Sequence, residues 1–205
     1  MPSDFLYQEA TSADVPAMAR CRAADPDAGP ADERMAGYLD GVHHPRQALP
    51  PRTAFIAVSR GEVVGYIAGH ATTRLLPPSG SESKGSESKG SESKGSESKG
   101  SESKGSESRD SGTADSDPNA CEGEVQYLYV APGARRRRVA SQLLRLLGKW
   151  FDDRGIRRVC VNADVDSPGA TPFYVATRAR FVNRHWYIWD DIRSLSSPEE
   201  LDGLP

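Results

Sequence analysis

Apolar residues in this chain gather into short runs whose spacing predicts alternating strands and helices. Two nearly continuous runs, at 53–59 and 62–70, are separated by Arg60-Gly61, a pair typical of a tight hairpin. Because polar residues scarcely interrupt these runs, we expect both strands to be covered on both faces. The three prolines of 43–51 predict that this segment, which precedes the two strands, is a loop.

Helical spacing is clearest at 137–154, where one face carries Val139, Leu143, Leu144, Leu147 and Phe151. Weaker signals predict further helices after Thr11, at 31–41, and from Pro168 or Gly169. The remaining apolar runs predict strands at 5–10, 124–130 and 157–163, and strand material at 181–192. The resulting order, β-α-α-β-β-β-α-β-α-β, predicts a single mixed α/β domain.

A repetitive segment interrupts this pattern. Residues 80–104 are five perfect copies of Gly-Ser-Glu-Ser-Lys, and 105–109 is a sixth copy that ends in Arg109. Nothing in it can be buried to offset the ordering entropy, so we expect a disordered low-complexity insertion at 80–119, between the third and fourth strands. It would divide the domain into an N-terminal part (1–79) and a C-terminal part (120–205). A partner-binding arm and a marginal helix are the alternatives, and a glycine at every fifth position disfavours the helix.

The composition favours a reduced, cytoplasmic protein. The 205 residues carry a net charge of −3, and no stretch is long and apolar enough to span a membrane. The first residues lack the features of a secretory signal, and three cysteines at no metal-like spacing favour neither a disulfide framework nor a metal site. The slightly acidic balance argues against nucleic-acid binding.

The stretch from Leu128 to Ala140 combines a strand end, a turn and a helix start. Its four consecutive arginines, Arg135 to Arg138, supply charge-assisted donors suited to phosphates. A helix start adds unpaired N–H groups and a partial positive charge. These features predict a phosphate-binding turn, with a solvated arginine-rich helix start as the alternative.

This stretch resembles the acetyl-CoA loop of the GNAT acetyltransferase superfamily, written Arg/Gln-x-x-Gly-x-Gly/Ala. Arg135, Val139 and Ala140 fit the pattern in register, and the order of elements is similar to the GNAT fold, a single mixed sheet flanked by helices. The resemblance implies acetyl-CoA as co-substrate and no metal. The cofactor contacts that it implies are Leu128, Tyr129, Val130, Arg135, Arg136, Arg137, Arg138, Val139, Ala140, Ser167 and Ala170.

Arginine stands at three positions where the family pattern has glycine. Arg138 replaces the central glycine of the loop, and Arg136 occupies a place often taken by a second one. Arg178 replaces the glycine expected four residues after Tyr174. Arginine lacks the backbone freedom of glycine. If Arg138 keeps a negative φ, we expect its N–H to face the pyrophosphate; otherwise we expect a distorted loop and weaker cofactor binding.

Residues 170–174 resemble the family's Asn-x-x-Ala-x-x-x-Tyr signature, with Ser167 in place of the asparagine. The resemblance implies that Tyr174 lies near the CoA sulfur and acts as a general acid. A phenol has a pKa of about 10, so it stays protonated at pH 7 and can protonate a leaving thiolate. A core aromatic residue beside Phe173 is the alternative.

Acetylation of an amine also needs a base, and Glu124 begins the strand that leads into the loop. Some family members keep a glutamate base at this point, and a regular strand would place Gln126, Leu128 and Val130 on its face. A solvent-facing acid at a strand end is the alternative, and Glu122 is a weaker candidate.

A backbone N–H near Val130 is expected to polarise the acetyl carbonyl, because the family splays two parallel strands there. Residues that could contact the acceptor, or simply be surface or core residues, are His43, His44, His70, Tyr66, Trp186, Tyr187 and Trp189.

The resemblance therefore implies an N-acetyltransferase that moves an acetyl group from acetyl-CoA to a small-molecule or peptide amine, by direct transfer in a ternary complex. Direct transfer is favoured because no cysteine lies in a recognisable nucleophile setting. The alternative is a non-catalytic GNAT-like module that binds acyl-CoA or a protein partner, which the replaced glycines favour. Neither the acceptor nor the oligomeric state follows from the sequence.

Overall fold

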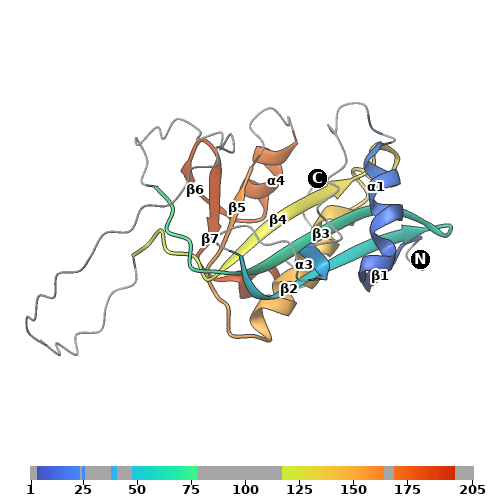
Figure 1. The fold of residues 1–205 in the computed structure, drawn as a ribbon. Coiled ribbons are helices and arrows are strands. Elements are labelled where there is room, and N and C mark those ends of the chain that lie inside the picture. Colours follow the sequence, from blue (N-terminus) through green and yellow to red (C-terminus); the bar gives the residue numbers. More distant parts are fainter. Residues whose placement is uncertain are drawn as a thin grey trace, which may run out of the picture.

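The computed structural model describes residues 4–23, 25, 38–40, 48–77, 117–163 and 169–196. The described elements, in chain order, are β1 (Leu6–Glu9), η1 (Ser12–Asp14), α1 (Val15–Ala23), β2 (Ala48–Ser59), β3 (Glu62–Thr72), β4 (Gly123–Val130), η3 (Pro132–Ala134), α3 (Val139–Asp152), β5 (Val159–Asn162), α4 (Ala170–Ala176), β6 (Arg180–Asn183), β7 (Trp186–Trp189) and η4 (Ile192–Ser196). Within these ranges the strands form one sheet in the order β1-β2-β3-β4-β5-β7-β6 (Figure 1). The predicted single mixed sheet with flanking helices is confirmed.

The hairpin predicted around Arg60-Gly61 is confirmed. β2 and β3 pair antiparallel along their length, and the two turn residues have φ values of 51° and 81°. Positive φ at both positions is what a two-residue type I′ turn requires, because its twist matches that of the flanking strands.

Two predicted boundaries are wrong. β2 begins at Ala48, so residues 48–51 belong to a strand and not to a loop. A register shift between Leu49 and Arg52 accommodates the two prolines there, which cannot donate to the ladder. The strand material expected at 181–192 is two strands, β6 and β7, followed by η4. The third proline of that segment, Pro45, lies outside the described residues, as does most of the helix expected at 31–41.

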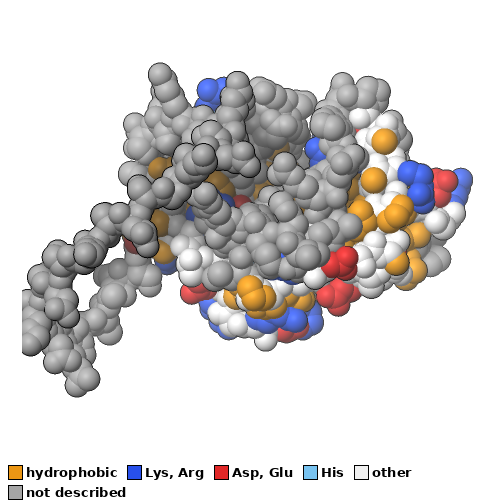
Figure 2. All heavy atoms as spheres, viewed as in Figure 1, with side chains coloured by type: hydrophobic (Ala, Val, Ile, Leu, Met, Phe, Trp, Pro, Cys, Tyr) orange, Lys and Arg blue, Asp and Glu red, His pale blue; other side chains and the backbone are white. Residues whose placement is uncertain are grey.

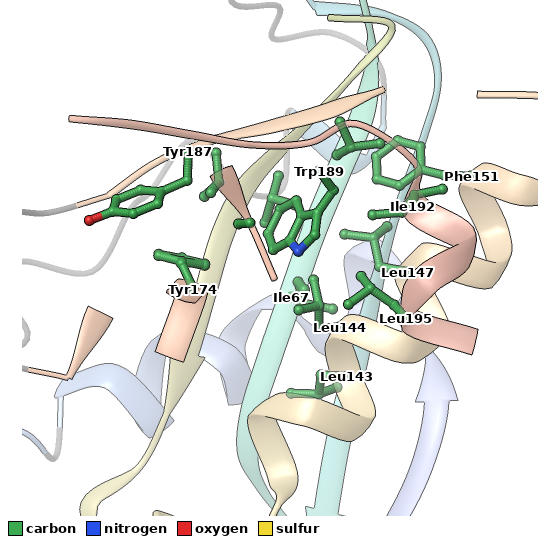
Figure 3. Packing of buried hydrophobic residues seen from close by; sticks show 14 of the residues in the cluster. Ile67, Leu143, Leu144, Leu147, Phe151, Tyr174, Tyr187, Trp189, Ile192 and Leu195 are labelled. Atoms are coloured by element: carbon green, nitrogen blue, oxygen red, sulfur yellow. The ribbon is translucent and has the colours of Figure 1, made fainter. Parts of the chain in front are cut away.

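Helices cover both faces of the sheet. α3 packs on one face, where its apolar side joins β7 and η4 in the largest core cluster. Figure 3 shows Trp189 of β7 lying between Tyr174 and the leucines of α3. α1 packs on the opposite face, where Met18 and Cys21 join Tyr66 and Tyr129.

Gly69 allows α3 to approach the sheet closely. A Cβ atom at this position would lie 2.9 Å from Leu147 Cδ2 and 3.0 Å from the Glu124 carbonyl oxygen. We therefore expect Gly69→Ala to lower the free energy of unfolding by about 1–3 kcal/mol, measured by urea denaturation. Gly133→Ala is the matched control, since a Cβ there meets nothing within 4 Å. Equal stabilities of the two variants would contradict this packing.

The chain on either side of the repeat is held together. The Leu76 N–H donates to the Asn119 carbonyl oxygen at 3.0 Å, and Leu75 and Ala120 form an antiparallel bridge. β3 and β4 then pair directly, so the predicted position of the insertion, between the third and fourth strands, is confirmed. Residues 78–116 themselves lie outside the described residues.

Because the chain segments on either side of the repeat already pair with each other at this bridge, we expect excision of residues 80–109 to leave folding nearly intact. The thermal midpoint of the shortened chain should lie within a few degrees of that of the full chain, measured by circular dichroism. A large fall in the midpoint would show that the repeat supports the fold.

On the face shown in Figure 2, the described acidic and basic side chains are interspersed. None of the described helices is both long enough and apolar enough to cross a membrane. The three cysteines are buried as free thiols.

Candidate active site

β4 and β5 begin as neighbours and then diverge. They pair in parallel only from Gly123 to Val125 of β4, against Val159 to Val161 of β5. Figure 1 shows the two strands separating beyond that point, with α4 at the open end. Among the described residues, the divergence leaves one edge of β4 without a strand neighbour over residues 126–130.

The backbone of β4 points into this opening at two residues. The Ala131 N–H donates to the Val64 carbonyl oxygen of β3 at 2.9 Å. Backbone groups alternate in direction along an antiparallel strand, so the N–H and C=O groups of Leu128 and Val130 point away from β3. This is the edge at which a thioester carbonyl or an amide of an extended ligand could pair with β4.

A bulge at Gln126 reverses which side chains share a face. Tyr127 pairs with Ala68 and Val125 with Gly69, so Gln126 has no counterpart in the β3 ladder. An extra residue in one strand shifts by one position the alternation of its side chains between the two faces of the sheet. Glu124 consequently shares its face with Tyr127 and Tyr129, on the α1 side of the sheet. The expectation that Gln126, Leu128 and Val130 share the face of Glu124 is wrong, because Leu128 and Val130 pack with the α3 core.

The arginines at the glycine positions adopt the backbone conformation of glycine. The φ values are 61° at Arg136, 63° at Arg138 and 62° at Arg178. A negative φ at Arg138 is therefore not observed, and the turn keeps a left-handed residue immediately before α3. Left-handed Arg178 ends α4, with the Ala179 N–H donating to the Tyr174 carbonyl oxygen at 3.0 Å.

The left-handed backbone at Arg138 predicts a difference between two substitutions. A side chain with a Cβ atom costs roughly 1–2 kcal/mol in this region, whereas glycine is free of that cost. We expect Arg138→Gly to exceed Arg138→Ala in free energy of unfolding by about 1 kcal/mol, measured in urea. Both variants lose the guanidinium, so the comparison isolates the backbone. An alanine variant as stable as the glycine variant would contradict the left-handed conformation.

Two of the loop arginines are held by the protein itself. Arg135 Nε donates to the Val130 carbonyl oxygen at 2.9 Å, and its guanidinium forms an ion pair with the buried Asp25. Asp25 Oδ2 also accepts the Tyr129 hydroxyl at 3.1 Å, so the loop is tied to the end of α1. Arg137 pairs with Asp4 at 2.7 Å. These side chains shape the loop, which leaves its backbone and the exposed Arg136 as the parts best placed for an anionic ligand.

The remaining predicted cofactor contacts occupy different environments. Val139 is buried in the core at the first turn of α3, and Ala140 is half-buried beside it. Tyr129 is buried on the α1 face, away from the diverging edge. Ala170 is half-buried at the start of α4, and Ser167 lies outside the described residues.

Glu124 is buried and paired, so the solvent-facing alternative is wrong. Its side chain is 5% exposed, and its Oε2 accepts from Arg74 Nε at 2.7 Å. Burial raises the pKa of the carboxyl group, and the charge and hydrogen bond of Arg74 oppose that rise. Cys160 of β5 is its ladder partner. The group is thus a carboxylate held in a poorly solvated position, which is the setting of many general bases.

Tyr174 lies in the α3 core at the open end of the β4–β5 divergence. Its ring packs against Phe173, Tyr187 and Trp189, with centroid separations of 5.5, 5.6 and 5.9 Å. Figure 3 shows Tyr174 and Tyr187 side by side. Burial raises the pKa of the Tyr174 phenol, so the hydroxyl is protonated at neutral pH. Both predicted roles, acid and core aromatic, are compatible with this position.

Several residues near Glu124 were not assigned to it from the sequence. His70 lies 3.8 Å from Glu124 Oε2, and Tyr38 reaches His70 Nδ1 at 3.0 Å. Arg74, which follows β3, stacks over the Trp186 ring at 4.7 Å. Strand pairing across β3 and β4 brings these groups together, so no local sequence signal marks them. Tyr66, Tyr187 and Trp189 are core residues, and His43 and His44 lie outside the described residues.

Comparisons with known proteins agree on one family. The model of the Acetyltransferase (GNAT) family matches residues 106–177. An acetyltransferase from Thermus thermophilus has 17% identity and a TM-score of 0.54, with 90% of this chain and 95% of that chain covered. A GNAT-family acetyltransferase from Staphylococcus aureus has 11% identity and a TM-score of 0.54, with 90% and 98% covered. An aminoglycoside 6'-N-acetyltransferase from Acinetobacter baumannii has 9% identity and a TM-score of 0.52, with 87% of this chain and 92% of that chain covered. No curated protein matches the chain.

Proposed function

Because residues 106–177 match the Acetyltransferase (GNAT) family model and the fold is similar to that of GNAT structures, we propose that this chain is a GNAT-type enzyme that transfers an acetyl group from acetyl-CoA to an amine, by direct attack in a ternary complex. The observation that carries the proposal is the divergence of β4 from β5 beside a loop whose arginines keep left-handed φ. An unpaired strand edge and the start of a helix are the two features that an extended, diphosphate-containing ligand needs.

The loop and the strand would divide the binding between them. Main-chain N–H groups from Arg136 to Ala140 would hold the pyrophosphate at the start of α3, with the exposed Arg136 adding a charged donor. The backbone of Leu128 and Val130 would pair with the pantetheine. Ala170, at the start of α4, would lie along the same channel.

The chemistry would be assigned to three groups of this chain. Glu124 accepts the proton of the amine, directly or through a water, as the nitrogen attacks the acetyl carbon. One backbone N–H of this edge, near Val130, donates to the carbonyl oxygen, where negative charge develops. Tyr174 gives its hydroxyl proton to the sulfur as the carbon–sulfur bond breaks.

Release of free thiol from acetyl-CoA tests this proposal. We expect thiol to appear only when an accepted amine is present, in a panel of small amines, amino acids, aminoglycosides and peptides with free N-termini. The acceptor that gives the highest kcat/KM would define the substrate class. An absence of amine-dependent thiol release across the panel would contradict the transferase.

A non-catalytic acyl-CoA-binding module is the second candidate. The ion pair of Glu124 with Arg74 favours it, because a carboxylate engaged by a guanidinium is a weaker base than an unpaired one. This candidate predicts saturable binding of acetyl-CoA without turnover of any amine in the panel.

A further inference from the structure

His70 has a buried polar atom that fold stability does not explain. The side chain is fully buried, and no hydrogen bond to Nε2 is formed among the described residues. A buried donor or acceptor without a partner is costly, so its retention calls for a reason. The group nearest to this nitrogen with an assigned chemical role is the Glu124 carboxylate, 3.8 Å away at Oε2.

The Tyr38 hydroxyl contacts the other ring nitrogen, Nδ1, and so bears on which nitrogen of the imidazole carries the hydrogen. The Tyr38 hydroxyl lies 3.0 Å from His70 Nδ1, and burial raises the pKa of that phenol, which therefore keeps its proton. Burial, with the charges of Arg52 and Arg74, lowers the pKa of His70 to about 4, so the ring is neutral at pH 7. If the hydroxyl donates to Nδ1, the ring hydrogen is on Nε2. The opposite tautomer would direct a nitrogen lone pair at a carboxylate, which is repulsive.

We propose that His70 is a positioning residue for Glu124, held by Tyr38 in the tautomer that presents an Nε2–H to the carboxylate and so stabilises the ionised base. The separation of 3.8 Å is roughly 1 Å longer than a hydrogen bond. A shift of about 1 Å in the Glu124 side chain would complete the contact. The role of Glu124 rests on the proposed function; the interaction with His70 does not.

Two side chains approach the same oxygen of the Glu124 carboxylate. Arg74 and His70 both approach Oε2, from the end of β3 and from β3 itself. Arg74 acts directly on the ionisation of Glu124, and Tyr38 and Cys160 each interact electrostatically with its charge. Arg52 faces His70 and Tyr38, and Tyr127 faces Tyr38.

Carboxyl ¹³C NMR of glutamate-labelled protein tests the proposal without a substrate. We expect His70→Leu to raise the pKa of Glu124 by about 0.5–1 unit, since it removes one hydrogen-bond donor from the carboxylate. His70→Gln should return the value to near that of the wild type, because the glutamine amide places an N–H close to the position of Nε2. An unchanged pKa in His70→Leu would overturn the proposal.

The tautomer provides a second test that needs no substitution at His70. In ¹⁵N NMR of the unmodified protein at pH 7, we expect a neutral imidazole with its hydrogen on Nε2. A hydrogen on Nδ1 would overturn the proposal even if His70→Leu failed to fold. If these NMR results hold but no amine is acetylated, the proposed function fails while the His70–Glu124 interaction stands.

Discussion

Tyr174→Phe should lower the rate of acetyl transfer by about 10²–10⁴-fold with little change in acetyl-CoA affinity. The substitution removes only the hydroxyl, so the ring keeps its packing against Tyr187 and Trp189. Without the phenol, the leaving thiolate must take its proton from solvent. The measurement is kcat by thiol release, together with the dissociation constant by isothermal titration calorimetry.

Tyr187→Phe is the matched control for this prediction. Tyr187 lies in the same aromatic cluster, but its hydroxyl donates to Thr171 Oγ1 at 3.1 Å. We expect that variant to keep most of its activity and to lose only about 1 kcal/mol of stability. If Tyr174→Phe is as active as Tyr187→Phe, Tyr174 is a core aromatic residue and has no part in the chemistry.

Glu124→Gln should lower kcat/KM by about 10²-fold or more, since the amide cannot accept a proton. Glutamine keeps the shape of the side chain and an oxygen for Arg74, so the fold should be preserved. The pH profile gives an independent readout. Because the folded environment raises the pKa of Glu124, the wild-type rate should fall with decreasing pH above the usual glutamate range. Glu124→Gln should lack that acid limb.

Glu122→Gln is the control for charge in this region. The Glu122 carboxylate accepts the backbone N–H groups of Arg157 and Arg158 at 2.6 and 3.1 Å, so it caps the start of β5. Glu122→Gln should lower the stability of the fold more than it lowers the rate of acetyl transfer. A loss of activity as large as that of Glu124→Gln would move the base from Glu124 to Glu122.

The elements of the fold could be predicted because their signals are local. α3 buries the residues whose helical spacing marked them, and the β2–β3 turn follows from Arg60-Gly61. The strand segment at 181–192 was not divided into two strands, although the polar residues 183–185 separate its two apolar parts. Its turn, at 184–185, has no glycine or proline to mark it.

The part of the candidate site that is contiguous in sequence could be predicted, whereas the groupings that depend on contacts between distant segments could not. The loop from Arg135 to Ala140 is contiguous, so its resemblance to a known pattern could be recognised. The bulge at Gln126 could not, since a bulge depends on the register with β3. The same holds for the grouping of Tyr38, His70 and Arg74 around Glu124, which strand pairing and tertiary packing create.

The backbone conformations of the three arginines at the glycine positions could be determined only from the structure. Sequence rules say that arginine avoids positive φ, not whether a surrounding fold imposes it. Here the turn before α3 and the end of α4 impose it at all three positions. The backbone path expected for glycine is therefore kept at a cost in stability, which the comparison of Arg138→Gly with Arg138→Ala measures.

Calorimetric titration of acetyl-CoA into the wild type, Ala140→Ser and Ala140→Asp tests the central claim most directly. Ala140 lies in the first turn of α3, where an aspartate is compatible with the helix but repels a diphosphate. We predict saturable one-to-one binding to the wild type and Ala140→Ser, and affinity at least about tenfold weaker for Ala140→Asp. No saturable binding to the wild type, or equal affinity in all three proteins, would contradict a diphosphate site at the start of α3.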